Sequence, residues 1–169
     1  MSRVGNGKLL LTIKPNYFVD LNTLLYFFLT KMKIAIVNGP NLNLIGTREP
    51  SVYGNQSLNE YLELLTNKSN LEIITFQSNI EGEIIDYLQK TIADGIIINA
   101  GGYSHTSVAI RDCISSISIP VVEVHISNIA SRESFRHESL LSPVCSGCIF
   151  GFGLESYRLA LNFFENKTI

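Results

Sequence analysis

The chain has 169 residues, a length most simply explained by one domain that buries a large core without disulfides or a metal. Hydrophobic residues make up 46% of the chain and charged residues 17%, and the formal net charge is -2 with a pI near 5.9. This balance lacks the basic footprint of a protein that binds nucleic acid or an anionic membrane surface, so we expect neither partner.

Residues 1–31 differ in character from the rest of the chain. Their apolar run, residues 21–30, is shorter than a membrane span and lacks the small-residue cleavage site of a signal peptide. Met32 stands immediately before the first strong strand pattern. We therefore expect residues 1–31 to be an extension outside the fold and residues 32–169 to form a single domain.

The first strong strand pattern runs directly into a long polar segment. The apolar, β-branched run Ile34–Val37 predicts a buried strand, and Gly39-Pro40 ends it. The segment that follows, up to Gly54, is too polar for a core and has the length that is typical of a binding loop or a lid. Its polar side chains are Asn38, Asn41, Asn43, Arg48, Glu49 and Tyr53.

Strand and helix patterns then alternate to the end of the chain. They predict strands at 71–77, 95–99, 119–125 and 147–152, and helices at about 58–67, 106–115 and 154–166. A further helix follows Ser78-Asn-Ile-Glu81, which has the same capping-box spacing as Ser57-Leu-Asn-Glu60. Its expected buried stripe is Ile80, Ile84, Ile85, Leu88 and Ile92. The alternation predicts an α/β protein, a flavodoxin-like doubly wound sandwich whose five-stranded parallel sheet has the order 2-1-3-4-5.

Polar residues gather where three of these strands end. Asn38 and Asn41 follow the first strand, Asn99 and His105 the third, and Glu123 and His125 close the fourth. In such sheets, ligands bind outside the carboxyl ends of the strands. Glu123 and His125 are two positions apart, so their side chains share a face and the carboxylate can orient or charge the imidazole. The pattern predicts a small-molecule site.

The three cysteines, Cys113, Cys145 and Cys148, argue against a secreted disulfide framework and for a cytoplasmic protein. Cys145-Ser-Gly-Cys148 has the spacing of a redox dithiol or of half a zinc site. It runs into an apolar strand instead of opening a helix, and no second pair completes a zinc site. Incidental structural thiols are the favoured interpretation.

Three separated motifs carry a family resemblance. They are Gly39-Pro-Asn-Leu-Asn-Leu-Ile-Gly-Thr-Arg-Glu-Pro-Ser-Val-Tyr-Gly54, Asn99-Ala-Gly-Gly-Tyr-Ser-His-Thr-Ser107 and Glu123-Val-His-Ile-Ser-Asn128, and Arg132-Glu-Ser-Phe-Arg-His137 agrees with them. In this order they resemble type II 3-dehydroquinate dehydratase, from about Met32 to the C-terminal helix. Ser104 stands where a threonine is common, a change that keeps the hydroxyl.

The resemblance implies reversible dehydration of 3-dehydroquinate to 3-dehydroshikimate in the shikimate pathway, through an enolate and without a metal or organic cofactor. The catalytic residues that it implies are Tyr53 as the base, His125 as the acid, Arg48 as stabiliser of tyrosinate and enolate, Asn41 as holder of a bridging water, and Glu123 as support of the polar network. The substrate-binding residues that it implies are Asn99, His105 and Arg136 for ring hydroxyls, Ile126 and Ser127 for the carboxylate, and Asp112 reaching toward a neighbouring subunit's site. It also implies a homododecamer, a tetramer of trimers.

Other interpretations remain open from the residues alone. A flavin or nucleotide binder of this fold would carry a Ser/Thr/Gly phosphate loop after the first strand, a phosphoacceptor domain would carry clustered aspartates there, and a non-catalytic scaffold would need neither. The amide-rich Gly39-Pro-Asn-Leu-Asn43 fits neither of the first two. Singly, His125 could cap a strand, Asn99 could start a turn, Arg48 and Glu49 could be a solvated ion pair, and Tyr53 could be a packing aromatic.

Overall fold

The computed structural model describes residues 4–5, 8–14, 17–20, 31–46 and 57–166, and the chain divides into two units, Met1–Lys31 and Met32–Ile169. In the first unit, β1 (Val4–Gly5), β2 (Lys8–Lys14) and β3 (Tyr17–Asp20) form an antiparallel sheet in the order β1-β2-β3. The sequence prediction did not include these strands. The apolar and aromatic runs on either side of Pro15-Asn16 are a hairpin signal that could have indicated them.

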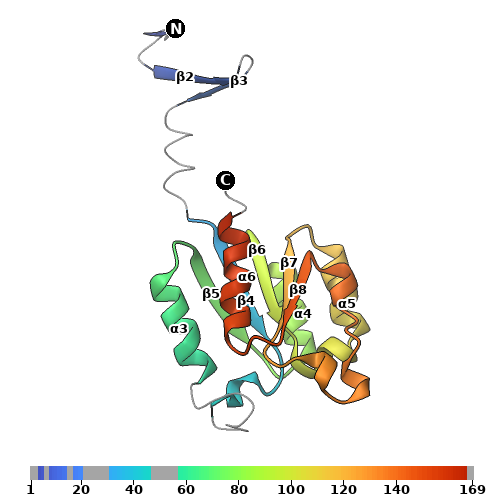
Figure 1. The fold of residues 1–169 in the computed structure, drawn as a ribbon. Helices are drawn as coiled ribbons and strands as arrows, with labels where there is room; N and C mark the ends of the chain where they lie inside the picture. Colours follow the sequence, from blue (N-terminus) through green and yellow to red (C-terminus); the bar gives the residue numbers. More distant parts are fainter. Residues whose placement is uncertain (1–3, 6–7, 15–16, 21–30, 47–56, 167–169) are drawn as a thin grey trace. The chain divides into compact units, whose positions relative to one another are not determined.

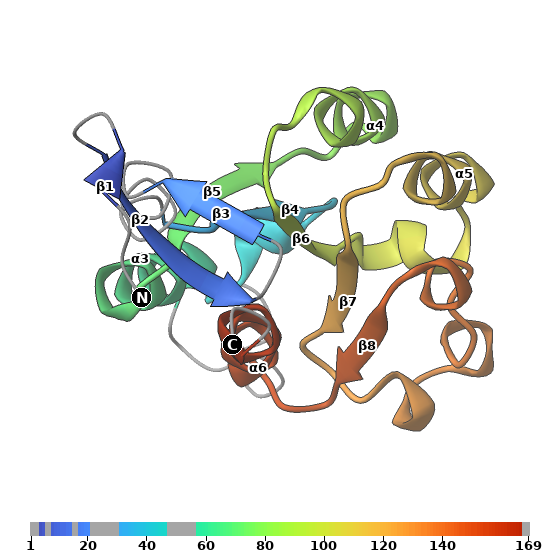
Figure 2. The ribbon, with the colours of Figure 1, turned by 90° about the horizontal axis from the view of Figure 1, so that it is seen from above.

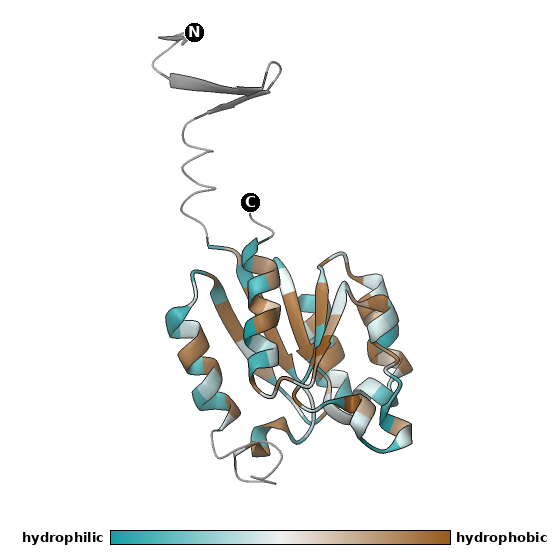
Figure 3. Cartoon of the chain, in the orientation of Figure 1, coloured by the Kyte–Doolittle hydropathy of each residue, from teal (hydrophilic) through white to brown (hydrophobic). Residues whose placement is uncertain are grey.

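The second unit is organised around a five-stranded parallel sheet. Its strands are β4 (Lys33–Asn38), β5 (Glu72–Gln77), β6 (Gly95–Asn99), β7 (Val121–His125) and β8 (Gly147–Phe150). They lie in the order β5-β4-β6-β7-β8, which confirms the predicted order 2-1-3-4-5. β6 and β7 are buried along their whole length, and β4 is buried from its second residue. Strands covered on both faces need apolar side chains on both, which explains the continuous hydrophobic runs (Figure 3).

Among the described residues, two helices cover each face of this sheet (Figures 1 and 2). The helices α3 (Leu58–Lys68) and α6 (Glu155–Glu165) lie on one face, and α4 (Glu81–Lys90) and α5 (Val108–Ser116) on the other. Within β4, Ile34 and Ile36 belong to the hydrophobic cluster of the α3/α6 face, whereas Ala35 and Val37 belong to that of the α4/α5 face. This alternation follows from the two-residue period of a strand. No helix among the described residues is long and apolar enough to cross a membrane.

The two predicted capping boxes have different outcomes. At α3 the prediction is confirmed, because Ser57 Oγ accepts from the Glu60 N–H at 3.2 Å and the Glu60 carboxylate accepts from the Ser57 N–H at 3.1 Å. At α4 it is wrong: the N-cap is Ile80, and the Ser78 hydroxyl accepts from the Ile80 N–H at 2.9 Å instead.

The predicted buried stripe of α4 is correct at its centre and wrong at its ends. Ile84 and Leu88 are buried, and Ile85 is half-buried. Ile80 and Ile92, however, are 59% and 82% exposed. Both lie outside the helix, which begins at Glu81 and ends at Lys90, so the helical period does not place them on its inner face.

Short 3-10 turns follow the carboxyl ends of the strands. They are η1 (Leu42–Leu44) after β4, η2 (Gly101–His105) after β6, and η3 (Ile129–Ser131), η4 (Ser134–Arg136) and η5 (Ser142–Val144) after β7. β4 and β6 leave the sheet in close contact, since the Gly39 N–H donates to the Asn99 carbonyl at 2.7 Å. A Cβ atom at Gly39 would lie 2.4 Å from the Ala100 carbonyl oxygen, so this approach requires glycine.

Candidate active site

A pocket of about 230 Å³ opens at the carboxyl ends of β4, β6 and β7. This is the edge at which α/β sheets bind ligands and at which the sequence predicts a site. Its wall combines backbone and apolar side chains with a polar group from each of the three strand ends. The polar residues that line it are Asn41, Asn99, His105, His125, Ser127, Arg132 and Arg136.

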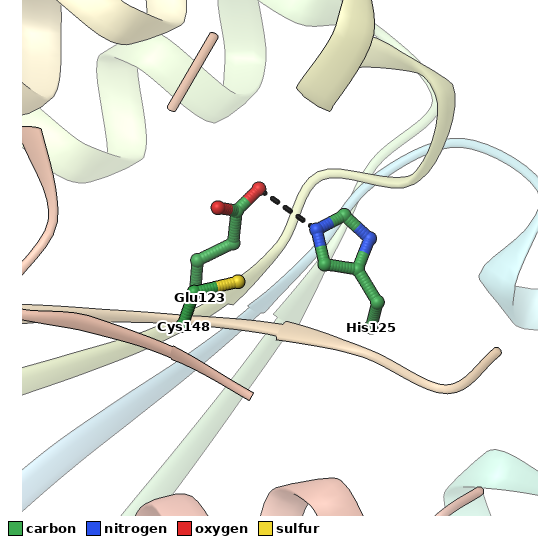
Figure 4. Close-up of side chains that lie close together, drawn as sticks. All are labelled: Glu123, His125 and Cys148. Atoms are coloured by element: carbon green, nitrogen blue, oxygen red, sulfur yellow. Dashed lines mark hydrogen bonds and ion pairs between the residues drawn. The ribbon is translucent and has the colours of Figure 1, made fainter. Parts of the chain in front are cut away.

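The centre of the site is a buried carboxylate and imidazole pair on β7. His125 Nε2 lies 2.9 Å from Glu123 Oε1 (Figure 4), as their two-residue spacing predicts. The Ser139 hydroxyl donates to Glu123 Oε1 at 2.7 Å, and the Ser142 hydroxyl donates to Glu123 Oε2. Because a carboxylate only accepts, Nε2 carries a proton.

These hydrogen bonds keep Glu123 ionised. Its side chain is completely buried, and burial by itself raises the pKa of a carboxyl group. The hydrogen bond and charge of His125 act in the opposite direction, as do the two serine hydroxyls, and they hold the pKa of Glu123 at about 2. The carboxylate holds the imidazole by its Nε2–H, and an imidazole positioned in this way at a pocket wall can serve in general acid–base catalysis.

Asn99 is held in place by a buried tyrosine. Its Nδ2 donates to the Tyr157 hydroxyl at 3.0 Å, and its Oδ1 accepts from the Gly101 N–H at 3.2 Å. The Tyr157 hydroxyl donates in turn to Asn38 Oδ1 at 2.6 Å. The amide orientation of Asn99 is therefore determined, and the second hydrogen on Nδ2 remains available at the pocket wall. Sequence reasoning missed Tyr157, which comes from α6 and carries no local polar motif.

Segments distant in the sequence contact His105 and Asn41. His105 Nδ1 lies 2.7 Å from the Glu138 carbonyl oxygen, which can only accept, so Nδ1 carries the proton and Nε2 of the neutral ring is an acceptor. Asn41 has a left-handed backbone with φ of 66°, and its N–H donates to Asn79 Oδ1 at 3.0 Å. Both side chains line the pocket, as predicted.

The segment after β7 offers the groups that would receive an anion. Ile126 and Ser127 line the pocket, and within the described residues neither of their N–H groups donates to a protein acceptor. Arg132 and Arg136 lie beside them, and both donate to Glu133 Oε2, at 3.3 and 3.0 Å.

Arg132 is a pocket residue that was not among the predicted site residues. It also donates to the Ser127 hydroxyl at 3.3 Å. The signal that could have found it is the repeated arginine of the Arg132–His137 segment, whose first member caps η3 and whose second ends η4.

Four predicted residues do not line the described pocket, and one of them, Glu123, contacts His125 from outside the lining. Arg48 and Tyr53 lie outside the described residues, so their positions stay predictions. Asp112 lies on α5 with its side chain 65% exposed, 3.0 Å from Arg111 Nη1, and it does not line this pocket. The subunit contact that the resemblance implies for Asp112 stays a prediction.

Known proteins resemble this chain in sequence and in fold. The family model described as Dehydroquinase class II matches residues 32–165. The chain belongs to this family. The 3-dehydroquinate dehydratase of Campylobacter jejuni is 53% identical to it over 135 residues, covering 77% of this chain and 85% of that protein. The 3-dehydroquinate dehydratase of Prochlorococcus marinus is also 53% identical over 135 residues, covering 77% of this chain and 93% of that protein.

Solved structures of type II dehydroquinases have the same fold. The crystal structure of the enzyme from Butyrivibrio crossotus superposes with a TM-score of 0.76 at 46% identity, covering 80% of this chain and 98% of that one. The enzyme from Propionibacterium acnes gives a TM-score of 0.73 at 34% identity, again over 80% and 98%. In this type II dehydroquinase, residues 32–165, which the family model matches, include every residue that lines the described pocket. Residues 1–31 lie outside the matched region.

Proposed function

We infer that the protein is a 3-dehydroquinate dehydratase, a hydro-lyase that converts 3-dehydroquinate to 3-dehydroshikimate in the shikimate pathway. Family membership supports this, together with relatives of that name at 53% identity. The single observation on the site that carries the inference is the buried Glu123–His125 pair, since an acid is needed where a hydroxyl leaves as water.

In the proposed reaction, His125 is the acid. Its Nε2–H remains bonded to Glu123, and the second ring nitrogen, which points away from Glu123 in Figure 4, delivers a proton to the departing hydroxyl. Water leaves, and His125 becomes a neutral imidazole whose Nε2–H still faces the carboxylate. Glu123 is thus a positioning residue that holds the imidazole by its Nε2–H.

Tyr53 is the proposed base, with Arg48 beside it. A phenol with its ordinary pKa near 10 is a poor base at neutral pH, but a guanidinium nearby favours the ionised form. Arginine suits this task because it does not give up its own proton. Tyr53 removes the proton next to the ketone, and the resulting enolate is stabilised by Arg48 and by a water that Asn41 holds.

The remaining pocket residues position the substrate. Asn99, His105 and Arg136 bind the ring hydroxyls, and the N–H groups of Ile126 and Ser127 bind the carboxylate. The positive charge of Arg132 and Arg136 complements that carboxylate. Proton transfers and elimination supply the whole reaction, so the proposal requires no cofactor.

The test is direct. Purified protein mixed with 3-dehydroquinate should develop the absorbance of a conjugated enone, and Tyr53→Phe should lose most turnover because it lacks the ionisable oxygen. Tyr87→Phe, which keeps its ring stacked on Phe76 at 4.2 Å, is the matched control and should be fully active. No enone from the parent protein would refute the proposed function, and flavin absorbance in the purified sample would favour a flavin binder instead.

We further propose a cytoplasmic homododecamer built as a tetramer of trimers, with Asp112 at a subunit contact. α5 offers a plausible surface, because Val108 is 58% exposed one turn before Asp112 on the same helix.

We also propose residues 32–169 as the catalytic domain. The family match over residues 32–165 supports this, and a version of the chain beginning at Met32 is expected to fold and to be active.

A further inference from the structure

The register between β7 and β8 places the thiol of Cys148 beside Glu123 and His125. β7 and β8 pair in parallel with Glu123 opposite Cys148, and residues paired in this way project to the same face of the sheet. One ligand atom each from Glu123, His125 and Cys148 lies within 4.8 Å of the other two. Figure 4 shows the Cys148 sulfur beside the Glu123 carboxylate and directed toward the imidazole.

Carboxylate, imidazole and thiolate are the three side-chain types that bind zinc. Metal–ligand distances of about 2.0–2.3 Å in a tetrahedron place ligand atoms about 3.3–3.8 Å apart. Glu123 Oε1 and His125 Nε2 lie 2.9 Å apart, closer than two ligand atoms on one zinc ion. Binding therefore requires these two atoms to move slightly apart and the Cys148 sulfur to move toward them. Glu123 is ionised, and Ser139 and Ser142 hold its carboxylate as a metal ligand's outer partners do.

We propose that Glu123, His125 and Cys148 form an inhibitory zinc site, with water as the fourth ligand. Cys148 supplies its sulfur from the edge strand β8, where the residue is half-buried. Cys145 is not part of this cluster, so the proposed ligands do not include both cysteines of the Cys-x-x-Cys motif.

Zinc at this position would remove the acid. The metal displaces the proton of His125 Nε2 to solvent and binds the lone pair left there, and the ring keeps one proton on its other nitrogen. Releasing that proton would leave an imidazolate, which makes the metal-bound ring a far weaker acid than an imidazolium. Binding also displaces the Cys148 thiol proton. The metal binding stands on the cluster alone, whereas the inhibition rests on the proposed dehydratase function.

Activity measurements give the first test. Zinc chloride, in a non-chelating buffer with a phosphine reductant, should lower kcat with little change in KM, and EDTA should restore it. Loss of even an outer-sphere partner costs about 10–100-fold in metal affinity. Cys148→Ser should therefore raise the half-inhibitory zinc concentration at least about tenfold, whereas the matched variant Cys145→Ser should leave it unchanged. Equal zinc sensitivity of both variants and the parent would overturn the proposal.

Cobalt(II) tests the binding without reference to activity. One equivalent added to the intact protein should produce a thiolate-to-cobalt charge-transfer band, which zinc displaces. The band should persist in Cys145→Ser and vanish in Cys148→Ser. Its absence from the parent protein would overturn the site even if the variants did not fold. A normal band in a protein without dehydratase activity would support the site and refute the proposed function.

Discussion

Glu123 keeps a negative charge in the interior, where an unpaired charge is very costly. His125, Ser139 and Ser142 satisfy its oxygens from one neighbouring position on β7 and from the segment before β8. Because three donors hold the carboxylate in place, the carboxylate in turn holds the His125 imidazole in one orientation. The residue thus has two roles that can be separated by experiment, one in catalysis and one in stability.

The catalytic role predicts a specific defect in Glu123→Gln. The amide keeps the size of the side chain but loses the negative charge that faces the imidazole, so kcat should fall by about 10–100-fold, less than the whole 10²–10⁴-fold that general acid catalysis supplies. KM should change little. Glu72→Gln is the control, because it removes a half-exposed carboxylate that pairs with Lys33 at 3.1 Å on the surface. Steady-state kinetics of both variants decide the matter: a normal kcat in Glu123→Gln would contradict the role.

The stability role predicts a pH dependence of defined sign. The pKa of Glu123 falls from an ordinary 4.5 to about 2 in the folded protein, so the unfolded chain takes up the proton first as the pH falls. The stabilisation is complete above about pH 4.5 and is lost as the pH falls toward 2. Urea unfolding between pH 6 and pH 3 should show the parent losing its advantage over Glu123→Gln. A constant difference across this range would refute the assignment.

Tyr157 predicts a mixed defect, because its hydroxyl joins two buried amides. Tyr157→Phe leaves Asn38 Oδ1 and Asn99 Nδ2 without this partner, and an unsatisfied buried polar group costs about 1–3 kcal/mol. Unfolding free energy should fall by that amount, and KM should rise more than kcat falls because Asn99 is less well oriented. Tyr61→Phe, whose hydroxyl bonds Glu155 at an exposed position, should change neither much. Unchanged KM in Tyr157→Phe would assign the tyrosine to stability alone.

Among the elements, the end of β4 shows most directly how the fold builds the pocket. The chain leaves β4 against β6, and Gly39 touches the Ala100 backbone. The left-handed Asn41 then turns the backbone into η1, whose Leu42 and Leu44 line the pocket. A close approach of two backbones therefore determines where the polar loop begins.

Gly39→Ala tests this approach. A Cβ there meets backbone rather than a movable side chain, so the variant should lose about 1–3 kcal/mol of stability or more, and most of its activity. Gly82→Ala is the matched substitution, because its Cβ would meet nothing within 4 Å and lies in α4, where alanine is favoured. It should be neutral or stabilising by up to about 1 kcal/mol. Thermal unfolding of the two variants should separate them clearly; equal effects would refute the steric explanation.

The start of α4 shows how tertiary contacts override a local motif. Ser78 and Ser57 have the same Ser-x-x-Glu spacing. The Ser78 N–H, however, donates to the Asn38 carbonyl, which continues the pairing of β5 with β4 beyond the strand. Tied to the sheet in this way, Ser78 cannot adopt the N-cap position, and its hydroxyl bonds the Ile80 N–H and Glu83 instead.

At the scale of the whole molecule, assembly is the prediction that matters most for activity. If Asp112 contacts a neighbouring subunit's site, Asp112→Ala should weaken substrate binding and loosen the trimer, so activity should fall on dilution. Asp86→Ala is the control, since Asp86 is an exposed α4 carboxylate that pairs with Lys90. Light scattering and activity are measured on the same diluted samples. A fully active monomer would refute the proposed assembly.

The sequence by itself determined the order of elements, the topology of the sheet and most of the pocket. Continuous apolar runs alternating with helical patterns leave few topologies, and the observed strand order is the one predicted. The polar residues after β4, β6 and β7 converge because carboxyl ends of parallel strands share one edge. The residue pair Glu123 and His125 follows from the two-residue period alone. The strand order, the converging polar residues and the Glu123–His125 pair all depend on local sequence pattern and on rules common to all parallel sheets.

Only the tertiary structure decided which distant residues complete the site. Tyr157 reaches Asn99 from α6, 58 positions away, and Cys148 stands opposite Glu123 through the register of β7 with β8. Neither relation has a local signature, because α6 packing and strand register depend on contacts between segments that the sequence does not place side by side. The same reason explains the shifted start of α4, where a backbone bond to β4 outweighs the capping preference of Ser78.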